Sequence, residues 1–188
     1  MSIGVDLSLR STGVVTLDDD LNLIDFILIN PSTKEYNDEK LLTYIANEIV
    51  SYVNCNLDEK FGLDRDYAIE GLSFMSVSAS KDIMYGNFWH LRCEIMNFTE
   101  DATITIYPVT KWRNGQFDKA TLKEWKTTVK NGLKELIVNK TPENVKIKFL
   151  EYIKEKKLHK NSIYDLCDAY WLCRYHILTK LGKEITKI

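Results

Sequence analysis

The feature that most constrains this chain is a short apolar run that ends in a carboxylate near the N-terminus. Residues 3–8 read Ile-Gly-Val-Asp-Leu-Ser, and a turn-like Leu-Arg-Ser-Thr-Gly leads into a second apolar run at 14–17. We interpret the two runs as strands joined by a tight turn. Asp6 then stands near the end of a buried strand, where an unpaired carboxylate is costly and needs a cation or a donor. The Ser8 and Thr12 hydroxyls could be those donors, which would make Asp6 structural.

Further apolar runs predict a chain that mixes strands and helices. Residues 23–29 predict a third strand, and the short links favour an antiparallel meander of the first three. A helix with one apolar face is predicted to start at 37–39 and to run to about 53, followed by a polar connection at 54–65. The remaining predicted elements of this half are a strand at 67–69 that ends at Glu70, a helix at 81–98 and a strand at 103–107.

The chain after the fifth predicted strand is expected to be helical. We expect a loop at 111–115 and then a helix, capped by Asp118 or Thr121, that reaches about residue 138. Thr141 followed by Pro142 favours another helix start, with Thr as the cap and Pro at the first position.

The last predicted helix carries two acids three residues apart. Ser162 is its expected cap, and the helix is expected to reach about Leu181. Asp165 could be the reciprocal acid of a capping box, but this role does not explain Asp168. The helix is apolar nearly all round, which predicts burial, and neighbouring buried carboxylates repel one another unless cations join them.

Four acids could therefore meet at one point. Asp6 and Glu70 end two predicted strands, and a C-terminal helix laid across the sheet could add Asp165 and Asp168. Such an all-oxygen set suits Mg²⁺ or Mn²⁺. Two such ions ~4 Å apart would clamp the attacking water and the leaving oxygen of a phosphodiester displacement.

The charge of the chain is unevenly distributed. Residues 111–160 carry 14 Lys/Arg against 6 Asp/Glu, whereas residues 1–110 carry 7 against 18 and the formal net charge is −2. A basic segment on an acidic chain suggests a polyanion partner, and a solvated lysine-rich helix face is the plain alternative.

In its order of elements the chain resembles the ribonuclease H-like superfamily, and within it the RuvC-type Holliday-junction resolvases, especially the phage-encoded ones. The matching stretches are residues 3–13, 67–70, Tyr107-Pro108 and 165–169. The resemblance implies an α/β fold with a mixed five-stranded sheet, made of a three-strand antiparallel meander plus parallel strands and flanked by helices. It also implies a single RuvC-like nuclease domain over 1–188, with a basic helical insertion at about 111–140.

The sequence departs from the family pattern in two places. The first turn has Leu7-Ser8 where the family has Pro-Gly, and the segment that begins at Lys111 is longer than the family's compact loop. The family also places an aromatic residue shortly after the second acid to wedge the junction open. Phe74 is the candidate here, with a core phenylalanine as the alternative.

The function implied by the resemblance is metal-dependent, structure-specific cleavage of DNA. The chain would resolve four-way and related branched junctions by paired phosphodiester hydrolysis, as a crossover junction endodeoxyribonuclease. Two Mg²⁺ ions, or Mn²⁺ in their place, would be held by the catalytic acids Asp6, Glu70, Asp165 and Asp168. The residues expected to bind DNA, besides Phe74, are Lys111, Trp112, Arg113, Lys119, Lys123 and Lys126, with Trp112 either stacking or packing beneath the cations.

Other functions on the same fold stay open. A nuclease for flaps, forks or RNA–DNA hybrids would use identical chemistry, and a non-catalytic DNA-binding relative is disfavoured by the four acids. A phosphotransferase of the actin and hexokinase type needs two such domains, for which 188 residues are too few.

The second helix suggests a homodimer. Its sheet-covering stripe is predicted to be Ile83, Met84, Phe88, Leu91, Ile95 and Phe98, which leaves Tyr85, Trp89 and Met96 partly exposed in a monomer. Aromatic residues and Met are enriched in interfaces, and a two-fold dimer would match the two-fold symmetry of a four-way junction.

The sequence also favours a cytoplasmic protein. The strand that starts the chain leaves no room for a signal-like core, and no apolar run approaches the ~20 residues of a membrane span. If the chain is phage-encoded, the host cytoplasm is the expected location.

Overall fold

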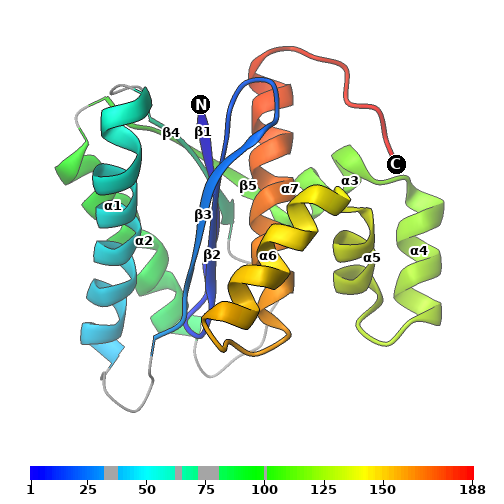
Figure 1. The fold of residues 1–188 in the computed structure, drawn as a ribbon, viewed down its shortest axis with the longest axis horizontal. Helices are drawn as coiled ribbons and strands as arrows, with labels where there is room; N and C mark the ends of the chain where they lie inside the picture. The colour runs from blue at the N-terminus through cyan, green and yellow to red at the C-terminus, as the bar shows by residue number, and fades with distance from the viewer. Residues whose placement is uncertain (32–37, 62–64, 72–80, 100) are drawn as a thin grey trace.

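The computed structural model describes residues 1–31, 38–61, 65–71, 81–99 and 101–188. In these ranges five strands form one sheet in the order β3-β2-β1-β4-β5, and seven helices flank it (Figure 1). The strands are β1 (Ser2–Asp6), β2 (Thr12–Leu17), β3 (Leu23–Ile29), β4 (Asp66–Gly71) and β5 (Thr103–Pro108). The helices are α1 (Asp38–Phe61), α2 (Lys81–Phe98), α3 (Val109–Gln116), α4 (Lys119–Thr128), α5 (Gly132–Lys140), α6 (Glu143–Glu155) and α7 (Ser162–Lys180).

The sheet is mixed, as predicted. β1, β2 and β3 form the antiparallel meander, and β1–β4 and β4–β5 are parallel pairs. In the pairing of β1 with β4, Val5 is the partner of Ile69, so Asp6 and Glu70 are the next residues along two neighbouring parallel strands. The carboxyl ends of these strands therefore bring the two acids to the same edge of the sheet.

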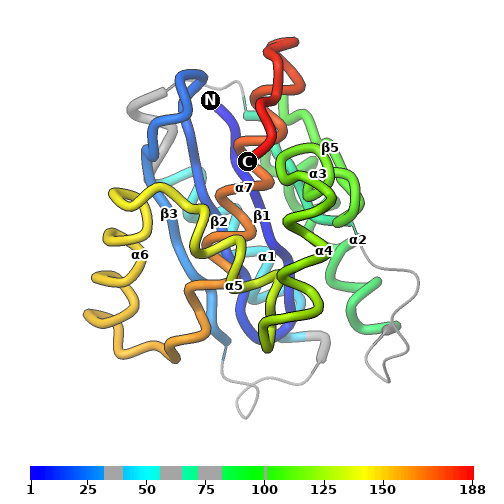
Figure 2. Tube along the Cα trace, turned by 90° about the vertical axis from the view of Figure 1, so that its right-hand side faces the viewer, coloured from blue at the N-terminus to red at the C-terminus, as the bar shows by residue number. Residues whose placement is uncertain are grey.

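The two faces of the sheet bury separate apolar cores. α1 and α2 cover one face, where Ile3 and Val5 of β1 pack among fully buried residues such as Ile45 and Leu91. α7 covers the other face, and α3, α5 and α6 pack around α7, while α4 packs on α5 at the outside (Figures 1 and 2). The result is a three-layer arrangement with the sheet in the middle and α7 at the centre of one outer layer.

Two glycines let α7 lie directly on the strand backbones. A Cβ atom on Gly4 would lie 2.3 Å from the backbone oxygen of Ala169, and one on Gly13 would lie 2.3 Å from that of Asp165. The Cys173 thiol donates a hydrogen bond to the Ser2 carbonyl at 3.1 Å. Helix α7 therefore runs antiparallel to β1, with its N-terminal turns over the carboxyl end of that strand.

Two segments that were predicted to be a loop or a connection are helical. Residues 111–115 lie inside α3, because Pro108 begins a helix that buries Trp112 and Gln116 on one face. Gly115 belongs to that packing, since a Cβ there would lie 2.3 Å from the ring of Tyr175. The polar stretch expected to connect the next elements continues α1 to Phe61, because it contains no Gly or Pro before Gly62 and polar composition alone does not end a helix.

The helix predicted to run from 118 to about 138 is two helices. Asp118 is the cap, as expected, and its side chain accepts a hydrogen bond from the Thr121 amide at 2.8 Å. The break follows from Asn131, which has a positive φ of 58°, and from Gly132, whose Cβ would lie 1.6 Å from the Trp125 carbonyl oxygen. This contact packs the start of α5 closely against α4, and α5 also packs on α7.

The two remaining cap predictions are wrong. The Thr141 hydroxyl donates to the Ile137 carbonyl and accepts from the Trp171 indole, and Pro142 holds the cap position of α6. Asn161 holds the cap position of α7 and its side chain makes no capping hydrogen bond, so Ser162 and Asp165 do not form the expected capping box. Asp165 is thereby left without the structural role that the sequence allowed.

Candidate active site

Four carboxylates come from three elements and meet at one end of the sheet. Asp6 ends β1, Glu70 lies in β4, and Asp165 and Asp168 lie in the first two turns of α7. Asp6 pairs with Gly13, and the backbone of Asp165 rests on that glycine, which places α7 over the end of β1. The pKa of Asp6 is raised well above its usual value by burial and then by the negative charges of Glu70, Asp168 and Asp165.

Glu70 is held by a neighbouring indole. The Trp112 side chain, which is fully buried, donates its N–H to Oε2 of Glu70 at 3.0 Å. Burial and the Asp168 charge nevertheless raise the pKa of Glu70 to about 7, against the opposing effects of Arg113, Trp112 and Lys134. The indole hydrogen bond orients the Glu70 carboxylate. Because the raised pKa means that the ionised form is disfavoured, a cation bound nearby would stabilise it.

Asp168 is nearly enclosed and only half satisfied. Its Oδ2 accepts from the Arg113 guanidinium at 3.1 Å, and its side chain is 8% exposed. Its Oδ1 is buried and has no hydrogen-bond partner in the described part of the chain. Burial raises the pKa of Asp168 in spite of Arg113 and Lys134, and burial likewise raises the pKa of Asp165.

The hydroxyls that could have given Asp6 a structural role are used elsewhere. Thr12 Oγ1 donates to the Ser8 carbonyl at 2.7 Å and accepts from the Ser8 amide at 3.1 Å. The Ser8 hydroxyl accepts from the Arg10 amide at 3.3 Å. These bonds shape the turn after β1, so the charge of Asp6 is left to be balanced by something other than the turn.

This donor set fits a divalent cation in its chemistry. As they stand, no three Asp, Glu, His or Cys side chains within the described ranges lie together closely enough to enclose a metal ion. However, the four acids offer only oxygen atoms, which Mg²⁺ and Mn²⁺ prefer, and the orphaned Oδ1 of Asp168 lacks the partner that a buried oxygen requires. Their mutual repulsion would be relieved by positive charge placed between them.

The residues predicted to bind DNA divide into two groups. Trp112 packs beneath the basic surface, and Arg113 turns inward to Asp168. The exposed group is Lys111, whose Nζ lies 5.8 Å from the Tyr107 ring centre, together with Lys119, Lys123 and Lys126 on α4. Phe74 lies outside the residues that the structure describes.

Sequence reasoning missed Lys134. Its charge lowers the pKa of Glu70, Asp165 and Asp168, so it stands within electrostatic reach of the acids. No pattern in the sequence separates Lys134 from the other cations of the basic segment. Its position depends on the break between α4 and α5, where the sequence predicted one continuous helix.

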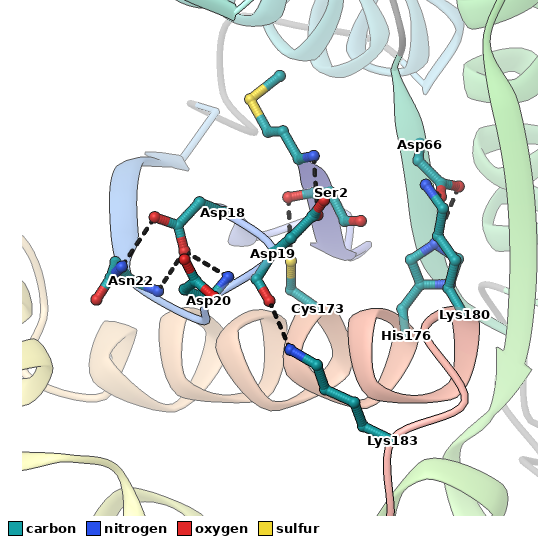
Figure 3. A network of polar contacts seen from close by, with 11 residues as sticks. Ser2, Asp18, Asp19, Asp20, Asn22, Asp66, Cys173, His176, Lys180 and Lys183 are labelled. Atoms are coloured by element: carbon teal, nitrogen blue, oxygen red, sulfur yellow. Dashed lines mark hydrogen bonds and ion pairs between the residues drawn. The ribbon is translucent and has the colours of Figure 1, made fainter.

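A second polar cluster surrounds Asp66, which pairs with Ser2 at the end of the sheet opposite to the acids. Figure 3 shows Asp66, His176 and Lys180 of this cluster. Asp66, at the start of β4, contacts His176 Nε2 at 2.9 Å and Lys180 Nζ at 2.8 Å, and the Tyr107 hydroxyl bonds to His176 Nδ1 at 2.9 Å. These side chains line a cavity of about 520 Å³. The cluster fastens the C-terminal half of α7 to β4 and β5.

The sheet order, its strand directions and the position of α7 define a RuvC-like fold of the ribonuclease H-like kind, as predicted. One solved structure with this fold is that of Thermus thermophilus RuvC in complex with a Holliday-junction substrate. It is 10% identical, with a TM-score of 0.59, and the match covers 96% of this chain and 95% of that one. A second T. thermophilus RuvC structure, also 10% identical, has a TM-score of 0.55 and coverages of 97% and 96%.

The other comparisons add no relative, since no protein-family model and no curated protein matches the sequence. At 10% identity the likeness to RuvC establishes the fold. Among the helices that the structure describes, none has the length and apolar character to cross a membrane.

Proposed function

We propose that this chain is a metal-dependent, structure-specific endodeoxyribonuclease that resolves four-way DNA junctions by paired phosphodiester hydrolysis. The observation that carries the proposal is the meeting of Asp6, Glu70, Asp165 and Asp168 at one end of the sheet, where each acid has a raised pKa. A fold shared with a protein solved on a Holliday junction supports the choice of substrate.

In this proposal the four acids hold two Mg²⁺ ions, with Mn²⁺ able to replace them. When bound, such ions supply an activated water and a stabilised leaving oxygen. Trp112 orients the Glu70 carboxylate through the indole hydrogen bond. Arg113 shares the charge of Asp168 and, as a neighbour of the reaction centre, could also meet a phosphate of the substrate.

The outer face of α4 is the proposed backbone-binding surface. Lys119, Lys123 and Lys126 recur at intervals of four and three residues, which places them on one side of the helix, and all three are exposed. Phosphate contacts of this kind supply affinity and make it depend on salt, with little sequence preference.

A dimer through α2 completes the proposal. Trp89, Met96 and Phe98 are 56%, 57% and 60% exposed, whereas Phe88, Leu91 and Ile95 are buried against the sheet. Phe98 was expected in the buried stripe, but it lies in the last turn of α2, where it adds to the exposed apolar surface. A two-fold interface here would present two sets of acids to two strands of a junction.

Cleavage of a substrate panel tests the proposal. Four-way junctions should be cut in paired positions in Mg²⁺, faster than flaps, forks, linear duplex or RNA–DNA hybrids. Preferential cutting of hybrids or flaps would support the proposed hydrolysis but would assign a different substrate. Junction binding without any cutting in Mg²⁺ or Mn²⁺ would favour a non-catalytic relative.

Acid substitutions test the site itself. Asp6→Asn, Glu70→Gln and Asp168→Asn are expected to abolish cutting and to leave junction binding largely intact, because binding depends mainly on phosphate contacts. Asp20→Asn, in the exposed turn after β2, is the matched control and should cut normally. A variant that keeps near-normal cleavage removes its residue from the site.

A further inference from the structure

A pocket with cationic walls opens directly beside the four acids. It has a volume of about 630 Å³ and lies between the turn after β1, the start of α5 and the start of α7. Asp165 forms part of its wall, so pocket and acid cluster share a side chain. The other walls carry positive or donor groups: Arg10, Lys134, His159, Asn131 and Asn161.

Lys134 is held in place within this pocket. Its Nζ lies 5.5 Å from the centre of the Tyr164 ring, and the Tyr164 hydroxyl donates to the carboxylate of Glu135. A cation over an aromatic face is attracted by the ring and loses side-chain freedom before any ligand arrives. The same ammonium lowers the pKa of Glu70 and Asp165, so its charge also acts on the acids.

Two helices also begin at the pocket. Asn131 precedes α5 and Asn161 precedes α7, and neither side chain caps its own helix. The first backbone N–H groups of a helix carry partial positive charge and attract anions. These helix ends add to the field of the pocket's side-chain cations.

We propose that this pocket binds one nucleotide of the DNA strand being cut, with the phosphate next to the scissile one resting on Lys134 and Arg10. The inference depends on the proposed nuclease function and assigns a binding site within it. In the proposed function the acids would hold metal ions at one phosphate, and the adjoining wall would offer Arg10 and Lys134 to the next phosphate along the same strand. A volume of about 630 Å³ accepts a sugar and base in addition to the phosphate.

The salt dependence of junction binding tests the assignment, measured by fluorescence anisotropy in Ca²⁺ to prevent cutting. Lys134→Gln and Arg10→Gln should each bind more weakly, and each should lower the slope of log affinity against log salt by about one. Lys183→Gln is the charge-matched control. It lies beyond the far end of α7, about 27 Å along the helix from the pocket, and should leave the slope unchanged.

A second measurement removes charge from the DNA instead of from the protein. Single methylphosphonate linkages, which remove the charge of one phosphate, are placed in turn on each side of the scissile position. One neighbouring position should weaken wild-type binding, and the same change should have no further effect on Lys134→Gln. Wild-type binding that is indifferent at both positions would overturn the pocket assignment.

The outcomes separate this inference from the function on which it depends. If the wild type cuts junctions while Lys134→Gln and Arg10→Gln keep the affinity and slope of Lys183→Gln, the pocket assignment fails and the nuclease stands. If the wild type neither binds nor cuts any DNA, both fail together.

Discussion

The Arg113 guanidinium balances a charge that the protein has buried. It is the only cation within 4 Å of the Asp168 carboxylate in the described part of the chain. We expect Arg113→Gln to lower the free energy of unfolding of metal-free protein by about 2 kcal/mol, because Asp168 then lacks its charged partner. Urea unfolding in EDTA measures this, with Lys111→Gln on the exposed side of α3 as the control. Equal stability of the two variants would show that Arg113 does not stabilise the buried Asp168, and would leave DNA binding as its only proposed role.

Glu70 predicts how the stability of metal-free protein depends on pH. Its pKa is about 7 in the folded protein and 4.5 in an unfolded chain, so the folded state holds the proton more tightly. The stability from this carboxyl is complete below pH 4.5 and is lost as the pH rises through 7. The shift corresponds to about 3 kcal/mol. The midpoint temperature of thermal unfolding in EDTA should therefore fall as the pH is raised from about 5 to about 8.

Two controls bear on this pH dependence. Glu70→Gln should weaken it, because the amide does not titrate, while Asp6, Asp165 and Asp168 still do. Adding Mg²⁺ should raise the unfolding midpoint more at pH 8 than at pH 5, because the ion needs ionised carboxylates. A midpoint that rises from pH 5 to pH 8 in EDTA would contradict the burial assigned to Glu70.

At the scale of single residues, the four acids could be picked out from the sequence, but the side chains that contact them could not. Asp6 and Glu70 could be predicted because each ends an apolar strand, a pattern that is visible without tertiary structure. Trp112 and Arg113 belong to a segment read as a loop, and their inward contacts depend on α3 packing against α7. Lys134 depends in the same way on a turn made by Asn131.

At the scale of the elements, α7 packs directly on the sheet because Gly4 and Gly13 have no side chains. We expect Gly4→Ala to cost about 1–3 kcal/mol, because the added methyl would lie 2.3 Å from the Ala169 carbonyl and 2.7 Å from Cys173 Cβ. The helix must then move off β1, taking Asp165 and Asp168 from Asp6, and cleavage should fall more than stability alone explains. Denaturant unfolding and cleavage rates at saturating Mg²⁺ measure the two effects.

Gly86→Ala on α2 is the matched control. Its new methyl would meet only the flexible end of Leu42 at 3.2 Å, and alanine favours a helix interior. It should be as stable as the wild type or slightly more so. Normal cleavage by Gly4→Ala would show that the acids tolerate a shift of α7.

The elements were predictable where their signals are local. The meander and the bounds of α2 follow from alternating or periodic apolar residues bounded by turns. The region from 109 to 140 was misread because Pro108 and Gly115 look like loop residues. In the folded chain the proline starts a helix, and the glycine allows close packing on Tyr175.

For the whole molecule, the exposed face of α2 predicts the oligomeric state. We expect a dimer of about 44 kDa, twice the 21.9 kDa chain, by sedimentation at micromolar concentration. Trp89→Glu should give the monomer, because it replaces an exposed aromatic side chain of that surface with a charge. Leu150→Glu, at an equally apolar and 47% exposed position on α6, should leave the mass unchanged. A wild type that sediments as one chain, alone and on a junction, would end the dimer model.

The distance along the chain between the first acid and the last pair has a consequence for synthesis. About 160 residues separate Asp6 from Asp168. At roughly 5–20 residues per second a ribosome needs on the order of 10–30 s to make that stretch. Throughout this time β1 can already pair with β2, but α7 has not emerged to complete the set of acids. Under the proposed function, the nascent protein would therefore lack its complete set of acids, and would not cut DNA, until nearly all of this sequence has left the ribosome.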